Sequence, residues 1–326
     1  MRFIHRIDAL KSRAEVVQTD REALRKASFL DGRETFWNAR ETRGVEDLAK
    51  LREAQGSCRV RGWIFHVGFC GSTLLSHLLD QNGELLALRE PQALVDLADQ
   101  APQLRALGRA RSVKGWLETL DTHFGGIANP SGQEVVVKAS NWANPLLAYM
   151  AEADMLDKAI YVTMERRAWM RACIRGGRER LAWVARCVQH TAQVEPEVAR
   201  LMPLAVNGVR DPLDQIIRLA ALLDWAQHRT IARHDPRALR RIDYATIVDD
   251  PTRAIVRARD LLGLPQRADP VEPLGHHAKD PARAFDARQR ALEDRQVERA
   301  HGARIDAALE WIDAKAGSSQ SGRRRA

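Results

Sequence analysis

The chain has 326 residues, of which 45% are hydrophobic and 29% are charged, an ordinary balance for a globular protein with a sizeable core. Its formal net charge is +8 and only 6% of its residues are aromatic. With no recognised DNA- or RNA-binding motif, this composition argues against a nucleic-acid partner and suits a small anionic ligand, although a solvated arginine-rich surface would look the same.

Residues 1–55 form a polar segment that predicts helices packed against the edge of a core domain. Thr19 or Asp20 can serve as a helix cap, and Phe29 and Leu30 supply an apolar pair. No residue pattern in this segment points to chemistry.

The next segment has the layout of a phosphate-binding loop. Residues 63–67 are an apolar run that predicts a buried strand, and leucines recur with helical spacing between residues 74 and 79. The glycines between them let backbone N–H groups surround an anion, and the helix N-terminus adds partial positive charge. A tight turn without a ligand has the same signature. The candidate binding residues are Gly68, Phe69, Cys70, Gly71, Ser72 and Thr73.

Three further apolar segments end in polar or charged residues. Leu85–Leu88 leads into Arg89 and Glu90 before a proline, and residues 135–137 lead into Lys138. A third segment, 159–164, precedes a strongly basic helical stretch. Strands that alternate with helices predict an α/β fold, in which a P-loop-type parallel sheet carries helices on both faces. Ligands of such sheets bind at the carboxyl ends of the strands.

The basic stretch offers cations with near-helical spacing, which either form a solvated face or reach a ligand. Residues 176–236 predict a helical insertion that shapes a substrate pocket, and a long polar helix should run to residue 316. The core domain is therefore expected over 56–316, followed by a disordered basic tail, 317–326. The candidate ligand cations of the basic stretch are Arg166, Arg167 and Arg171.

Residues 69–75, Phe-Cys-Gly-Ser-Thr-Leu-Leu, resemble the 5′-phosphosulfate loop of the sulfotransferase family, Arg/Lys-Ser-Gly-Thr-Thr-Leu-Leu. The strand that ends in Lys138, the next strand and the segment 241–265 follow the family's order. The resemblance implies 3′-phosphoadenosine 5′-phosphosulfate as donor, a hydroxyl or amine acceptor and no metal. Phe69 and Met164 replace two basic residues of the family, so the chain is similar to a divergent member.

The resemblance also implies catalytic roles for two residues. Lys138 would stabilise charge on the transferring group, and Glu90 matches a general base of the protein-tyrosine branch. Glu90 could equally pair with a nearby cation. With Phe69 in the loop, catalysis needs another cation, which Arg89, Lys138 or the basic helix could supply.

Two other functions compete with sulfuryl transfer. A kinase or other phosphotransferase would use the loop with ATP, but no Lys follows Gly71 and no strand ends in a convincing Mg²⁺-binding carboxylate. A catalytically degenerate member would bind a nucleotide or a protein partner. The adjacent His276 and His277 make a poor metal site because their side chains diverge.

The sequence also indicates the cellular compartment of the protein. No apolar run approaches the ~18 residues of a membrane span, and no apolar signal-peptide core follows Met1. The four cysteines show no paired spacing, which argues against a disulfide framework or a zinc site. A cytoplasmic protein with reduced thiols is expected, and its oligomeric state is open.

Overall fold

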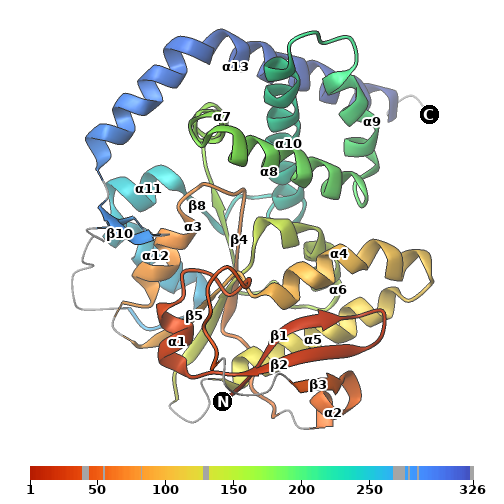
Figure 1. Cartoon of the computed structure of the whole chain (residues 1–326), viewed down its shortest axis with the longest axis vertical. Coiled ribbons are helices and arrows are strands. Elements are labelled where there is room, and N and C mark those ends of the chain that lie inside the picture. Colours follow the sequence, from red (N-terminus) through yellow and green to blue (C-terminus); the bar gives the residue numbers. More distant parts are fainter. Residues whose placement is uncertain are drawn as a thin grey trace. The chain divides into compact units, whose positions relative to one another are not determined.

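The computed structural model describes residues 1–38, 44–53, 56–81, 83–127, 132–266, 276–277, 280–284 and 286–323. The chain forms two compact units (Figure 1). The first unit combines Met1–Thr163 with His234–Phe285, and the second combines Met164–Arg233 with Asp286–Ala326. The boundary after Thr163 places the whole basic stretch in the second unit.

A five-stranded parallel sheet forms the core of the first unit, in the order β5-β6-β4-β7-β8. Every residue of β4, β5 and β7 is buried, as expected for strands that are covered on both faces. The expected α/β fold class is confirmed. The strands are β4 (Gly62–His66), β5 (Leu85–Arg89), β6 (Glu134–Lys138), β7 (Ala159–Thr163) and β8 (Arg241–Asp243).

The order of the strands defines where a ligand should bind. After β4, the chain fills β5 and β6 on one side of it and then crosses to β7 and β8 on the other side. The carboxyl end of β4 therefore lies at a topological switch point, the position where open α/β sheets bind their ligands.

Helices flank this sheet. Helix α3 contacts β4, β5 and β6, and α12 contacts β7 and β8. The helices of the unit are α1 (Arg21–Lys26), α2 (Leu48–Glu53), α3 (Ser72–Leu79), α4 (Gln92–Ala106), α5 (Ala110–Gly126), the 3₁₀ helix η2 (Asn141–Leu146), α6 (Leu147–Glu152), α11 (Tyr244–Asp249) and α12 (Pro251–Leu262). A short antiparallel pair, β9 (His276–His277) and β10 (Asp280–Ala284), follows.

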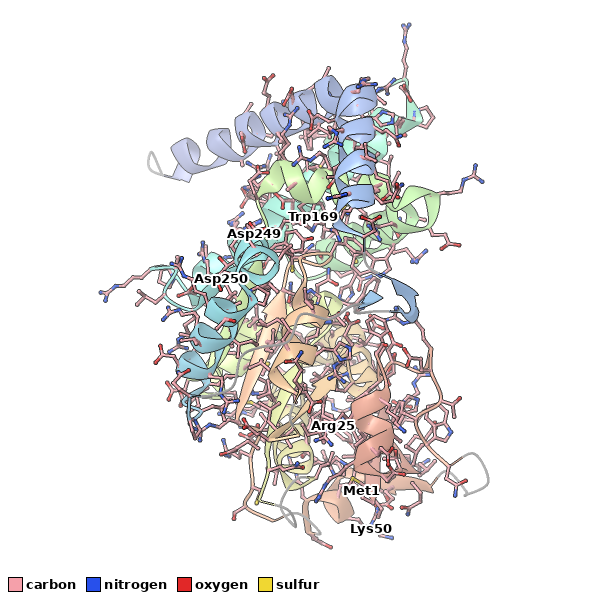
Figure 2. The ribbon with its side chains drawn as sticks, turned by 90° about the vertical axis from the view of Figure 1, so that its left-hand side faces the viewer. Met1, Arg25, Lys50, Trp169, Asp249 and Asp250 are labelled. Carbon is pink, nitrogen blue, oxygen red and sulfur yellow. The ribbon has the colours of Figure 1, made fainter. Side chains whose placement is uncertain are left out.

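The N-terminal segment differs from its expected helices. It forms an antiparallel sheet of β1 (Arg2–Asp8), β2 (Arg13–Gln18) and β3 (Gly44–Asp47), with two short helices. The register of β1 shifts between Ile4 and Arg6, so Ile4 and His5 are both buried and the period-two signal disappears. Asp20 caps α1 as expected. Met1, Arg25 and Lys50 label this segment in Figure 2.

The second unit is entirely helical where it is described. Its segment 176–236 is helical as expected, and residues such as Trp169, Val184 and Ile312 are buried in its core. Its last helix continues past residue 316, where the tail was expected to begin, and residues 324–326 lie outside the described residues. The helices are α7 (Arg166–Arg175), α8 (Gly177–Ala192), α9 (Pro196–Val206), α10 (Pro212–His234) and α13 (Ala287–Arg323). None of the described helices is long and apolar enough to span a membrane.

Candidate functional site

The loop between β4 and α3 has a left-handed backbone at three of its positions. The φ angles are 80° at Gly68, 53° at Phe69 and 77° at Gly71. A positive φ is common for glycine but unusual for phenylalanine. Gly71 is the N-cap of α3 and has no side chain that could cap the helix. Curled loops that lead into an uncapped helix N-terminus present N–H groups to an anion.

Both loop glycines are also required by their packing. A Cβ atom at Gly71 would lie 2.9 Å from the ring of Tyr244, and one at Gly68 would lie 3.0 Å from Nδ2 of Asn141. Tyr244 begins α11, directly after β8. A larger residue at position 71 would therefore strain the loop and displace Tyr244, so it would change more than the space for a ligand.

The hydroxyl and thiol side chains of the loop have different surroundings. The thiol of Cys70 is buried and donates to the carbonyl of Val162 at 3.3 Å, which ties the loop to β7. Thr73 is 2% exposed, and its Oγ1 has no hydrogen-bond partner among the described residues. A buried hydroxyl without a partner is costly, and an anion at the helix N-terminus would satisfy it.

Lys138 and Glu90 form a buried ion pair at the carboxyl ends of neighbouring strands. Arg89 and Lys138 are register partners in β5 and β6, and the N–H group of Glu90 donates to the carbonyl of Lys138 at 2.7 Å. The ammonium group of Lys138 contacts Oε1 of Glu90. The Lys138 side chain is 1% exposed and that of Glu90 is 11% exposed. Sheet geometry thus brings the two expected catalytic residues together.

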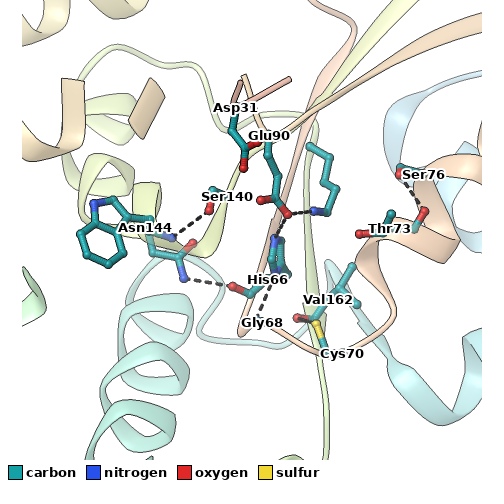
Figure 3. Close-up of polar contacts among 12 residues, drawn as sticks. Asp31, His66, Gly68, Cys70, Thr73, Ser76, Glu90, Ser140, Asn144 and Val162 are labelled. Atoms are coloured by element: carbon teal, nitrogen blue, oxygen red, sulfur yellow. Dashed lines mark hydrogen bonds and ion pairs between the residues drawn. The ribbon is translucent and has the colours of Figure 1, made fainter. Parts of the chain in front are cut away.

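His66 connects this ion pair to the loop. Its Nδ1 accepts a hydrogen bond from the N–H of Gly68 at 2.9 Å, which assigns the proton of a neutral ring to Nε2. Nε2 lies 4.0 Å from Oε1 of Glu90 (Figure 3). The side chain of Asn144 holds the carbonyl of His66 at 3.1 Å. The sequence analysis gave His66 no role, and the only signal was its position immediately before the loop.

Arg33 is a second residue that the sequence analysis missed. Its Nη2 lies 3.4 Å from Oε2 of Glu90, and its Nε donates to Oδ2 of Asp31 at 2.7 Å. Its guanidinium carbon lies 3.7 Å from the centre of the Phe29 ring. No local pattern marks Arg33, because it belongs to the N-terminal segment and reaches Glu90 only in the folded chain.

Arg89 was expected as a possible cation for the loop, and the structure corrects this. Its side chain is 1% exposed, pairs with Asp80 at 3.0 Å, and donates to the carbonyls of Arg25 and Ala27. Burial raises the pKa of Asp80 and lowers that of Arg89, because both charged groups are removed from water. Arg89 therefore fastens α1 to β5 and takes no part in the loop.

The candidate arginines of α7 are paired with carboxylates of their own unit. Arg166 contacts Asp224 at 2.9 Å and Asp313 at 2.8 Å. Arg167 contacts Glu298 and Asp306, and Arg171 contacts Glu298 at 3.1 Å. Asp224 belongs to α10, and the other carboxylates belong to α13. We call the contacts of α7 with α13, together with those of Arg175 to Glu293 and Asp294, the ion-pair ladder.

Metal-binding and disulfide chemistry find no support in the described part of the chain. There, no group of three or more His, Cys, Asp or Glu side chains is placed to hold a metal ion. All four cysteines are free thiols, and three of them are buried.

No protein-family model matches the chain, and no curated protein is significantly similar to it. Solved structures that are similar to the chain include two sulfotransferases. The sulfotransferase domain from the curacin biosynthetic pathway shares 11% identity over 71% of this chain and 84% of its own, with a TM-score of 0.38. A sulfotransferase from Alicyclobacillus acidocaldarius shares 15% identity over 77% of this chain and 96% of its own, with a TM-score of 0.37.

Proposed function

We propose that the chain is a sulfotransferase-like enzyme that binds 3′-phosphoadenosine 5′-phosphosulfate at residues Gly68–Thr73 and transfers the sulfuryl group to a hydroxyl or amine. The observation that supports this most is that the Lys138–Glu90 pair lies at the carboxyl ends of β5 and β6, next to the switch point at β4, with His66 between the pair and the loop. The partnerless Thr73 hydroxyl is a donor that suits an anionic ligand there.

The ion pair supports separate chemical roles for Glu90 and Lys138. In the transfer, the bond between sulfur and the donor's phosphate oxygen breaks and a bond between sulfur and the acceptor forms. Glu90 takes the proton that the acceptor loses. As Glu90 becomes neutral, the charge of Lys138 is no longer balanced by it and can stabilise the oxygens of the transferring group.

The α7 arginines are not assigned to the donor in this proposal. In the free protein, Arg166, Arg167 and Arg171 each contact carboxylates of their own unit. The loop, Thr73 and Lys138 are therefore the main contacts that we assign to the donor.

A degenerate nucleotide-binding protein is the second candidate. The free protein neutralises Lys138 with Glu90, and Met164 is buried and apolar. A phosphotransferase has less support, because the loop lacks a lysine after Gly71 and the described residues offer no metal-ligand cluster.

Calorimetric titration with adenosine 3′,5′-bisphosphate, ATP and sulfate tests these functions. The enzyme proposal predicts binding of the bisphosphate in preference to ATP, and transfer of labelled sulfate from the phosphosulfate to a panel of phenols and amines. Binding without transfer would leave the degenerate protein as the better reading. Preference for ATP with Mg²⁺ would favour a phosphotransferase, and no binding at all would refute a nucleotide site.

A further inference from the structure

The loop contains no cation of its own. Residues 67–73 read Val-Gly-Phe-Cys-Gly-Ser-Thr, and the nearest buried lysine, Lys138, is balanced by Glu90. A dianionic ligand at this loop would need a second positive charge from elsewhere in the first unit. Arg89 cannot supply it, since it is buried against Asp80 and α1.

The N-terminal segment is held against the same end of the sheet by backbone hydrogen bonds. The N–H of Leu30 donates to the carbonyl of Arg89 at 2.7 Å, and its carbonyl accepts from the N–H of Gln92 at 3.1 Å. These two hydrogen bonds join Leu30 to residues on either side of Glu90 in the chain. Leu30 is fully buried, so residues 28–34 have a fixed place beside the ion pair.

This placement delivers Arg33 to Glu90. The two oxygens of Glu90 face different cations, since Oε1 contacts Lys138 and Oε2 lies 3.4 Å from Arg33. Phe29 lies beneath both, 3.7 Å from the Arg33 guanidinium carbon and 5.9 Å from the Lys138 ammonium nitrogen. An aromatic face stabilises a cation without neutralising it.

The two cations differ in their freedom to move. The side chain of Lys138 is 1% exposed, whereas that of Arg33 is 56% exposed. A series of neighbouring residues leads from the loop to this arginine. Gly68 lies 2.9 Å from His66, His66 lies 4.0 Å from Glu90, and Glu90 lies 3.4 Å from Arg33. Arg33 can therefore turn from Glu90 and Asp31 toward a ligand while Phe29 still supports it.

We infer that Arg33 is the cation that completes the anion site: it contacts Glu90 and Asp31 in the free protein and binds the nucleotide's anionic groups in the complex. This inference rests on the proposed function. It also assigns a role to the N-terminal segment, which is to bring a guanidinium group to the carboxyl end of β5. A guanidinium fork binds phosphate or sulfate oxygens with two hydrogen bonds.

The test is calorimetric titration of the full-length chain and its Arg33→Ala variant with adenosine 3′,5′-bisphosphate. The loss of one charge-assisted contact predicts a Kd that rises roughly ten- to hundredfold. Arg33→Lys, which keeps the charge but not the fork, should fall between them. Arg13→Ala is the matched control, because the Arg13 side chain is 58% exposed and also pairs with a carboxylate. It should change neither the Kd nor its salt dependence.

A rescue variant separates a ligand contact from a purely structural role. Phe69→Arg in the Arg33→Ala background places a cation in the loop itself and should recover most of the lost affinity. A merely structural arginine would not be replaced in this way. Unchanged affinity in a folded Arg33→Ala variant, or no rescue, would overturn the inference while leaving the proposed function intact. If the unaltered chain binds no nucleotide, both fall.

Discussion

The first unit and the second unit both pair cations with carboxylates, but in different surroundings. At the strand ends of the first unit, Lys138 and Arg89 are each 1% exposed. In the ion-pair ladder, Arg166, Arg167 and Arg171 are 29–32% exposed. Buried pairs are sensitive to the loss of either partner, whereas exposed pairs contribute about 0–1 kcal/mol each.

This difference shows why a dense run of arginines is poor evidence for a ligand site. The ladder has more than one carboxylate for each arginine, so no positive charge is left over for a ligand. The Lys138–Glu90 pair is smaller, but it adjoins the loop before α3, where the buried Thr73 hydroxyl has no hydrogen-bond partner among the described residues. For this reason we base the proposed donor site on position at the strand ends and not on the number of charges.

The largest loss of stability should come from breaking the buried Asp80–Arg89 pair, which holds the N-terminal segment. Asp80→Asn leaves Arg89 buried without its carboxylate partner, and we expect the free energy of unfolding to fall by about 3–5 kcal/mol. Urea denaturation followed by tryptophan fluorescence measures this. Asp306→Asn in the ladder is the matched control and should cost no more than about 1 kcal/mol. Equal losses would remove the contrast between the two regions.

The next effect concerns Lys138. Lys138→Met leaves Glu90 partly buried beside an apolar group, so stability should fall by about 3 kcal/mol, and affinity for adenosine 3′,5′-bisphosphate should fall at least about a hundredfold. The double variant Lys138→Met/Glu90→Gln should recover stability but not affinity or turnover. Arg171→Met provides the comparison from the ladder. A Lys138→Met variant that binds normally would exclude Lys138 from the donor site.

The stability of the first unit and that of the second unit should also depend differently on pH. Burial raises the pKa of Asp121 to about 6, and burial lowers that of His123 to about 4. The Asp121 contribution to stability is complete below its unfolded pKa of 3.8 and is lost as pH rises through 6. The His123 contribution is complete above 6.5 and is lost as pH falls through 4. Hydrogen bonds from Arg167 lower the pKa of Glu298, so its stabilisation is lost only as pH falls below 4.5.

The opposite trends of Asp121 and His123 largely cancel between pH 4 and 6.5, and single substitutions should reveal each of them. Asp121→Asn should lose up to about 3 kcal/mol of stability on acidification across this window, because only His123 still titrates. His123→Gln should show the opposite slope. Urea midpoints measured at several pH values provide the test. Three identical profiles would contradict it.

The smallest effect is expected for Thr73→Val, which removes only a hydroxyl that has no partner in the free protein. Stability should be unchanged or slightly higher, while nucleotide affinity should fall by about 1–2 kcal/mol. Thr191→Val, which removes a hydroxyl bonded to the carbonyl of Cys187, is the control and should affect stability alone. Unaltered affinity in Thr73→Val would show that the hydroxyl does not face the ligand.

The sequence predicts the parts of the site that depend on local pattern. The strand–glycine–helix layout, the burial of β4 and β7, and the convergence of Lys138 and Glu90 follow from apolar runs and from the rule for parallel strands. The N-terminal sheet escapes prediction because the bulge in β1 hides its alternation.

Partners that are distant in the chain could not be predicted. Arg33 meets Glu90 across 57 residues, and the ladder arginines form hydrogen bonds with their α13 carboxylates across 119 to 147 residues. Arg89 is instructive because it adjoins Glu90 yet faces α1. Glu90 lies just beyond the end of β5 and has a left-handed φ of 55°, a local conformation that the apolar pattern of the sequence does not reveal.

Leu30 pairs with the outer edge of β5, so removal of the N-terminal segment should affect how the protein associates. β5 is an edge strand of the sheet, and at its carboxyl end the N–H and carbonyl groups of Leu30 occupy positions that a strand from another molecule could take. A version shortened to begin after residue 36 would uncover that edge together with the apolar surface under Phe29 and Leu30. Such a fragment should self-associate through added strands, so expression of the isolated sheet should retain the N-terminal segment.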